Sequence, residues 1–481
     1  MNDSKPTIVW FRSDLRVSDN PALSAAVARG GPVIPVFIWA PEEEKPWAPG
    51  GARRWWLHQS LDKLQRALQG MGSDLVLRQG ASLSTLRQLI ADSGADTVYW
   101  HRRYEPAVIE RDKKVKQDLK DDGLDAQSFN SHLLYEPWEV ATKQGDPYKV
   151  FTPFWKTCTA MPEPDAPLEA PARGDLPQPD AWPESDPLDA LGLMPKVEWY
   201  KDIASFWTPG ESGAQERLDT FLNDAIRAYK ENRDVPSIDA TSRLSPYLCH
   251  GEIGPRQVWH TVRRFMQDGR RNLSKSEEKQ CWAYLREIGW REFGYHVLYH
   301  FPHTPDKPLQ KKYADFPWVN DESQLHAWQK GRTGYPLIDA GMRQLWRIGW
   351  MHNRVRMVVA SFLVKDLLIS WQEGARWFWD TLVDADLANN TLGWQWAGGC
   401  GADAAPYFRI FNPILQSKKF DANGDYIRTY VDELKHVKTD DIHAPWEAAA
   451  PLLDQTDYAA PLIDHKEARD RALAALDEVT G

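Results

Sequence analysis

The chain has 481 residues, of which 42% are hydrophobic and 26% are charged, and its formal net charge is −10. The length predicts two or three domains, and the composition is that of a globular protein rather than a disordered one. Lys365 and Asp366 interrupt the longest apolar stretch, so the sequence predicts no membrane-spanning helix. The N-terminus lacks the features of a signal peptide and the four cysteines are widely scattered, so we expect reduced thiols and a cytoplasmic protein.

The charge is unevenly distributed along the chain. Residues 161–200 hold nine acidic and two basic residues, a local sum of −7, whereas residues 341–419 hold nine basic and six acidic residues, a local sum of +3. The acidic total therefore does not exclude a local basic face for phosphates. Tryptophan occurs 24 times, more often than tyrosine or phenylalanine. Most of these indoles should be bulky core, while some can serve as stacking platforms or redox relays.

The first part of the chain alternates short apolar runs with amphipathic stretches. Buried parallel strands are predicted at residues 7–11, 32–39, 74–78, 96–100 and 125–129. Residues 52–72 have the apolar spacing of a helix and end near glycines, which suits a C-cap. This alternation predicts an α/β domain with a doubly wound parallel sheet over residues 5–135. No GxGxxG fingerprint follows the first strand, which disfavours NAD binding there.

The rest of the chain divides into a connector and a helical part. Residues 136–200 are predicted to form the connector, and nine prolines with an acid excess in residues 161–200 favour a surface-draped segment there. Beyond residue 200 the apolar spacing is helical, which predicts a mostly α domain over residues 201–475.

Chemistry-bearing residues first gather in the stretch WREFGYH. A helix here places Glu287, Trp290 and Gly294 on one face, which gives a carboxylate, an indole plane and a gap. Taken alone, a partly buried tryptophan beside an ion pair is the simpler explanation.

A second stretch, WMHNRVRM, is basic but continues into a strongly apolar segment. Asn353 and Arg356 would share one face, with Arg354 pointing elsewhere, so one arginine can pair with a buried carboxylate while the other meets phosphate. The alternative is a solvated basic face. Asp384 and Asp386 are the candidate partners of Arg356.

Three further segments are less specific. Residues 384–413 combine carboxylates, paired asparagines, two tryptophans and an arginine with small residues, which suggests a large flat ligand. The hydroxyl residues of ATSRLSPYLCHGEIGP, residues 240–255, suit a phosphate cradle, although taken alone the pattern favours an ordinary N-cap. His296 and His300 have a zinc-like spacing, but the sequence lacks an HExxH glutamate, and packed or surface histidines are favoured.

Together these segments resemble the photolyase–cryptochrome family, from the first strand to about residue 470. The motifs TSRLSPYL, WREF, TGYPLIDAGMRQL, GWMHNR, DADLANN, GWQWAGG and ADAAPYFRIFNP occur in the family's order. The resemblance implies an N-terminal antenna-binding α/β domain, a long connector and a helical domain that holds FAD in a U-shape. It also implies that the flat ligand is the flavin.

The resemblance assigns residues to the flavin site. They are Tyr229, Thr241, Ser242, Arg243, Leu244, Ser245, Tyr284, Arg291, Asn353, Arg356, Asp384, Asp386 and Asn390. Arg356, paired with Asp384, would keep the reduced flavin ionised, as expected for an active FADH⁻ form. Asn390 would lie beside flavin N5, where an amide cannot readily supply a proton. Trp394, Trp371 and Trp318 match the family's electron relay, and Trp377 and Trp379 are either a branch of it or, more simply, packing residues.

The resemblance also implies a site for damaged DNA. The lesion contacts would be Arg233, Glu287, Trp290, Asn353, Arg354, Met357, Trp396, Arg409 and Gln416. Glu287, Trp290, Asn353, Met357 and Asn390 are the candidate catalytic residues. A flipped pyrimidine dimer would stack on Trp290 and Trp396.

Within the family, Asn353 and Met357 are similar to the cyclobutane-dimer type, and the segment around Asp384 resembles bacterial class III photolyases. The implied function is that of a deoxyribodipyrimidine photo-lyase, a monomer that uses light and reduced FAD to split cyclobutane pyrimidine dimers in DNA. The alternative is a cryptochrome-type blue-light photoreceptor with little or no repair activity. A light-independent flavin oxidoreductase would explain neither the tryptophans nor the phosphate-binding arginines.

The antenna chromophore is predicted from the same resemblance. Class III relatives suggest methenyltetrahydrofolate, with Glu105 as a contact, and a deazaflavin is the alternative. Ala107 and Val108 stand where some folate binders have an Asn-Glu pair, so the pocket must differ.

Overall fold

The computed structural model describes residues 4–404, 409–448, 453 and 456–480. Its first part is a five-stranded parallel sheet with strand order β3-β2-β1-β4-β5. The strands are β1 (Thr7–Phe11), β2 (Val33–Trp39), β3 (Val76–Gln79), β4 (Thr97–His101) and β5 (Asp125–Phe129). In the register, Thr7 pairs with Val33 on one side and with Thr97 on the other. All five predicted strands are confirmed, with ends shifted by up to two residues.

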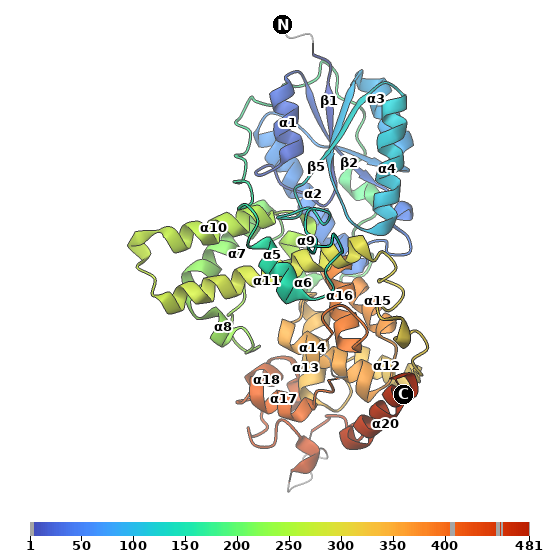
Figure 1. The fold of residues 1–481 in the computed structure, drawn as a ribbon, viewed down its shortest axis with the longest axis vertical. Helices are drawn as coiled ribbons and strands as arrows, with labels where there is room; N and C mark the ends of the chain where they lie inside the picture. The colour runs from blue at the N-terminus through green and yellow to red at the C-terminus, as the bar shows by residue number, and fades with distance from the viewer. Residues whose placement is uncertain (1–3, 405–408, 449–452, 454–455, 481) are drawn as a thin grey trace.

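Helices cover both faces of the sheet (Figure 1). They are α1 (Pro21–Arg29), α2 (Gly51–Gly70), α3 (Ser82–Ser93) and α4 (Pro106–Asp121). Val9 and Phe11 of β1 pack with α1 and α2, while Ile8 and Trp10 pack with α3 and α4, because successive side chains of a strand point to opposite faces. Burial on both faces explains the continuous apolar runs of the strands. The predicted α/β, doubly wound arrangement is confirmed.

The connector contains a helix that the sequence did not reveal. Helix α5 (Phe151–Cys158) buries Phe151, Phe154 and Cys158 against Phe293 of α11 (Lys275–His300). Between residues 161 and 200 the chain has a single 3-10 turn, η2 (Leu188–Leu191), and lies largely along the surface. The high proline content prevents longer regular structure there.

The remaining chain is helical and lies beyond the sheet in Figure 1. Its helices are α6 (Lys201–Phe206), α7 (Glu211–Asp224), α8 (Tyr229–Asn232), α9 (Ser245–His250), α10 (Pro255–Gln267), α11, α12 (Glu322–Gln329), α13 (Pro336–Ile348), α14 (Asn353–Ser361), α15 (Trp371–Thr381), α16 (Leu387–Gly398), α17 (Pro413–Phe420), α18 (Asp425–Tyr430) and α20 (His465–Thr480).

The helical apolar pattern of residues 336–371 is interrupted twice in the structure. Gly349 has a φ of 65° and ends α13 with a left-handed residue, which lets the chain turn into α14. A π-helical segment, η6 (Phe362–Asp366), follows α14 directly. The sequence pattern did not predict either interruption, because both sides of each remain apolar.

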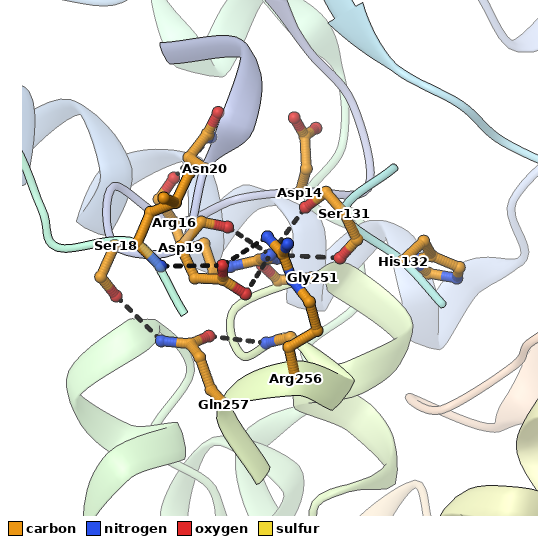
Figure 2. A network of polar contacts seen from close by, with 12 residues as sticks. Asp14, Arg16, Ser18, Asp19, Asn20, Ser131, His132, Gly251, Arg256 and Gln257 are labelled. Carbon is orange, nitrogen blue, oxygen red and sulfur yellow. Dashed lines mark hydrogen bonds and ion pairs between the residues drawn. The ribbon is translucent and has the colours of Figure 1, made fainter. Parts of the chain in front are cut away.

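A buried ionic network joins the sheet to the helical part (Figure 2). Arg16 donates to the Gly251 carbonyl at 2.9 Å and to Ser131 Oγ at 2.6 Å. Asp19, which is fully buried, accepts a 2.5 Å bond from Arg256 of α10. The network therefore fixes the relative position of the two parts.

None of the helices in the described chain is long and apolar enough to span a lipid bilayer. The four cysteines are buried and free of disulfides. Burial raises the pKa of the Cys249 thiol to about 12, so this thiol stays protonated at neutral pH.

Candidate active site

A cavity of about 680 Å³ lies in the helical part, with walls from α8, α9, α11, α14, α15 and α16. Its volume lies within the range of about 300–1,000 Å³ that is usual for small-molecule and cofactor sites. Every residue of the predicted flavin set except Arg243 lines it. These residues are Tyr229, Thr241, Ser242, Leu244, Ser245, Tyr284, Arg291, Asn353, Arg356, Asp384, Asp386 and Asn390.

An ion pair lies on the wall of this cavity. Arg356 Nη2 donates to Asp384 Oδ2 at 2.8 Å and to Oδ1 at 3.1 Å. Ser245 Oγ donates to the same Oδ2 at 2.6 Å, and Arg356 Nε is held by the Met351 carbonyl at 2.7 Å. Spacing alone left Asp384 and Asp386 open as partners of Arg356, the family resemblance implied Asp384, and the structure pairs Arg356 with Asp384.

Asp386 has a different environment. Its Oδ1 accepts the Asn389 amide at 2.8 Å as the N-cap of α16, and its Oδ2 accepts the Tyr295 hydroxyl. Tyr295 in turn contacts His132 Nε2 at 2.6 Å, and Arg291 donates to the His132 carbonyl at 2.7 Å. Burial lowers the pKa of His132 well below its usual value, so its imidazole is neutral. A chain of hydrogen bonds therefore links the cavity to the loop after β5.

The predicted lesion residues line the same cavity, apart from two. Those on its wall are Arg233, Glu287, Trp290, Asn353, Arg354, Met357 and Trp396. Trp290 stacks on Phe151 of the connector, with ring centroids 3.7 Å apart and planes 10° from parallel. Glu287 forms an ion pair with Arg233. Both explanations of WREFGYH are thus present together, a carboxylate and indole that face a cavity and an ion pair beside a partly buried tryptophan.

Three predicted residues lie elsewhere. Arg243 does not line the cavity, and its guanidinium lies 5.6 Å from the Trp350 ring centroid and 3.3 Å from Asp239. Arg243 has a left-handed backbone conformation, with a φ of 51°. Arg409 and Gln416 also lie outside the cavity wall. Residues 405–408 of the motif ADAAPYFRIFNP are outside the described residues.

The candidate relay begins at the cavity. Trp394 of α16 lines it and is 2% exposed. Trp371 is buried at the start of α15, and Trp318 is partly buried with its ring 4.4 Å from that of Phe316. Of the two branch candidates, Trp379 donates to the Ala48 carbonyl at 2.7 Å and Trp377 stacks on Trp346 at 6.3 Å.

Other predicted groups are engaged in structural contacts. Glu105 accepts a 2.7 Å bond from Arg103, and this charge holds the pKa of Glu105 well below its usual value although burial opposes the shift. His296 Nε2 accepts the Tyr148 amide at 2.9 Å, and His300 Nε2 lies 3.0 Å from the Pro137 carbonyl.

Sequence reasoning missed several residues of the wall. Phe378, Asn389 and Asp403 line the cavity, and Tyr295 and His132 reach it through Asp386. The spacing of Asp386 and Asn389 is a capping signal that was visible in the sequence. Nothing local marks Phe378, whose place depends on the packing of α15.

Comparison with known proteins agrees with the geometry. Residues 7–172 match the model of DNA photolyase, and residues 284–478 match the model of the FAD binding domain of DNA photolyase. A deoxyribodipyrimidine photo-lyase of Agrobacterium fabrum is 50% identical over 98% of this chain and 97% of its own length.

The chain belongs to the photolyase–cryptochrome family. Cryptochrome-1 of Arabidopsis thaliana, also a member, is 40% identical over 98% of this chain and 70% of its own length. The crystal structure of a bacterial class III photolyase from Agrobacterium tumefaciens is similar to this chain, with a TM-score of 0.94 and 48% sequence identity. The match covers 100% of this chain and 98% of that chain. The predicted resemblance, including its class III character, is confirmed.

The residues of this family member fit FAD, the cofactor of its matched domain. The cavity supplies hydroxyl and guanidinium groups, which suit the phosphates and ring edge of a dinucleotide, between the apolar side chains of Leu248, Ile288 and Phe378.

Proposed function

We propose that the protein is a deoxyribodipyrimidine photo-lyase that splits cyclobutane pyrimidine dimers in DNA. One observation supports this most directly: the Arg356–Asp384 pair and the Glu287–Trp290 pair line a single cavity. A cofactor and a flipped base can therefore meet there without water between them.

Reduced FAD, when bound and excited by light, supplies the electron that opens the cyclobutane ring of the dimer. The residues of the predicted flavin set that line the cavity would hold it, and Arg243 lies outside the cavity wall. The positive charge of Arg356 stabilises negative charge on the ring system. Asn390 donates its amide N–H to the Ala375 carbonyl at 3.0 Å, which fixes how the amide faces the cavity.

The other side chains of the wall receive the lesion. Trp290, backed by Phe151, and Trp396 form apolar surfaces on which the flipped dimer stacks. Glu287 accepts a hydrogen bond from the thymine edge and, with Asn353 and Met357, orients it. Arg233 and Arg354, together with Arg409 outside the cavity, contact the phosphates that flank the lesion, and Gln416 is a further contact to the damaged DNA. Trp394, Trp371 and Trp318 pass electrons inward to restore the reduced cofactor.

We further propose that residues 5–135 form an antenna-binding domain and residues 201–475 form a domain that binds FAD and DNA, with residues 136–200 as the connector between them. The antenna would be methenyltetrahydrofolate, or alternatively a deazaflavin. Glu105, Ala107 and Val108 line a cavity of about 70 Å³ that would have to widen for it. We expect a monomer, and the buried free thiols suit a reducing cytoplasm.

The test is repair of a dimer-containing oligonucleotide under blue light by the reduced, FAD-loaded protein, with a dark control. We expect light-dependent loss of the dimer in the wild type, and its abolition in Glu287→Ala/Trp290→Ala with FAD retained. Glu278→Ala/Trp282→Ala is the matched control, because both residues are exposed on α11 outside the cavity.

The alternative function is a blue-light photoreceptor, as in the cryptochrome relatives. A wild-type protein that binds reduced FAD and DNA but repairs no dimer would overturn the photolyase proposal and favour the photoreceptor.

A further inference from the structure

Four charged side chains alternate in sign at the edge of the cavity. Glu287 of α11 pairs with Arg233, which follows α8 directly. Arg233 Nε also lies 4.0 Å from Asp234 Oδ1, and Asp234 Oδ2 accepts a 2.8 Å bond from Arg354 Nη2 of α14. We call these residues, Glu287, Arg233, Asp234 and Arg354, the charge row.

The charge row neutralises the very groups that would hold DNA. Arg233 and Arg354 are two of the three arginines assigned to phosphates, and each is paired with a carboxylate in the free protein. The side chains of Asp234 and Glu287 are 32% and 29% exposed, so the ion pairs lie at the protein surface, where DNA can reach them, rather than in the core. A phosphate that approaches Arg354 must therefore compete with Asp234.

Arg354 is also prevented from moving far. Its guanidinium lies 4.4 Å from the ring centroid of Phe420, and its buried Nε has no hydrogen-bond partner among the described residues. A guanidinium stacked on an aromatic ring keeps its donors in one plane. It can thus exchange a carboxylate for a phosphate by a small shift.

On these grounds, and resting on the proposed repair function, we propose that Asp234 is a specificity-determining residue that withholds Arg354 from DNA until a lesion enters the cavity. An inserted dimer donates a hydrogen bond to the carboxylate of Glu287, which then no longer pairs with Arg233. Arg233 is already near Asp234 and forms an ion pair with its carboxylate. This pair replaces the Arg354–Asp234 pair, so Arg354 can bind a phosphate. On undamaged DNA no dimer binds Glu287, so Arg233 stays paired with Glu287. Release of Arg354 would then leave Asp234 without a cation, and Arg354 therefore stays paired with Asp234.

The prediction concerns binding of undamaged DNA most strongly. In Asp234→Asn, Arg354 is free at all times and gains a phosphate contact on any duplex. One added phosphate contact steepens the dependence of log K on log salt by about 0.9, which corresponds to about tenfold tighter binding at low salt. A dimer-containing duplex gains less, about threefold or under, because partner exchange already releases Arg354 there. The preference for damaged DNA should therefore fall by at least about threefold.

The experiment measures anisotropy of labelled duplexes with and without a single dimer, in the dark, from 50 to 200 mM salt. It uses FAD-loaded wild type, Asp234→Asn, Asp234→Glu and a matched control, Asp96→Asn. Asp96 pairs with Arg29 at 2.6 Å and is 38% exposed, so this substitution removes an equivalent charge from the sheet domain. Asp234→Glu keeps the charge and should remain near the wild type, as should Asp96→Asn.

Tighter, more salt-dependent binding of undamaged duplex by Asp234→Asn alone supports the inference. Weaker or unchanged binding by Asp234→Asn, or an equal effect in Asp96→Asn, overturns it. If the wild type repairs dimers in light but Asp234→Asn keeps its preference for them, only this inference fails. If the wild type repairs no dimers, the proposed function fails and this inference fails with it.

Discussion

Gly374 provides a stringent test of how the candidate relay is packed. This residue lies within α15, one turn after Trp371, and faces the Trp394 indole of α16. A Cβ at this position would lie 2.6 Å from Trp394 Cζ2 and closer still to Cη2 and Cζ3. Favourable contacts between carbon atoms are about 3.5–4.0 Å, so in Gly374→Ala the indole must move by about 1 Å or more.

The displaced ring has little space to enter. Trp394 is 2% exposed, and its ring lies 5.0 Å from that of Phe378 and 6.2 Å from that of Trp328. Inserting a methyl group into such packing typically costs about 1–3 kcal/mol. In an unobstructed helix the same substitution stabilises by about 0.5–1 kcal/mol, so the sign of the change distinguishes the two situations.

We therefore expect Gly374→Ala to melt at a lower temperature, by about 2–4 °C for each kcal/mol in a domain of a few hundred residues. Light-driven reduction of bound FAD, followed by absorbance with an external donor, should also slow because Trp394 no longer keeps its position. Gly70→Ala in α2 is the control, since no described atom beyond its chain neighbours and the adjacent backbone of its own helix lies within 4 Å of the added Cβ. A Gly374→Ala protein with unchanged or raised melting temperature and unchanged photoreduction would refute the packing argument.

Three other predictions address the ionic groups. Arg16→Met removes the bonds of Arg16 to Gly251 and Ser131 and its ion pair with Asp19, so denaturant titration should show a loss of stability of about 3–5 kcal/mol. A loss below about 1 kcal/mol would contradict the network's importance. Burial raises the pKa of Glu252 from 4.5 to about 8, so between these values the folded protein retains a proton that the unfolded chain releases. The contribution of protonated Glu252 to the free energy of unfolding is therefore present at low pH and is lost as pH rises from about 4.5 to 8. Glu252→Gln should flatten that pH dependence of unfolding, and an identical profile would show that Glu252 is ionised when folded. Arg356→Met leaves the Asp384 carboxylate buried without its cation, so purified protein should carry less FAD by absorbance, whereas full occupancy would exclude a flavin-holding role for the pair.

The sequence by itself was sufficient for features that depend on local periodicity. The five strands follow from apolar runs such as residues 33–39, because a strand buried on both faces needs apolar side chains at every position. Most of the predicted cavity wall was implied by the family resemblance of the motifs, whereas spacing alone placed only Asn353 and Arg356 together, because they lie in one helical turn.

Tertiary structure alone decided which groups meet across the chain. Spacing left Arg356 with two candidate carboxylates, and although the family resemblance implied Asp384, it is the approach of α14 to the segment before α16 that brings this pair together. Phe151, which stacks on Trp290, lies on a connector helix that the sequence did not reveal. Asp234 and Arg354, which form a hydrogen bond, are 120 residues apart in the sequence. Such contacts depend on how helices cross and on which side chains remain after the core is filled. Periodicity records which face of a helix is apolar, but it carries no information about the partner of that face.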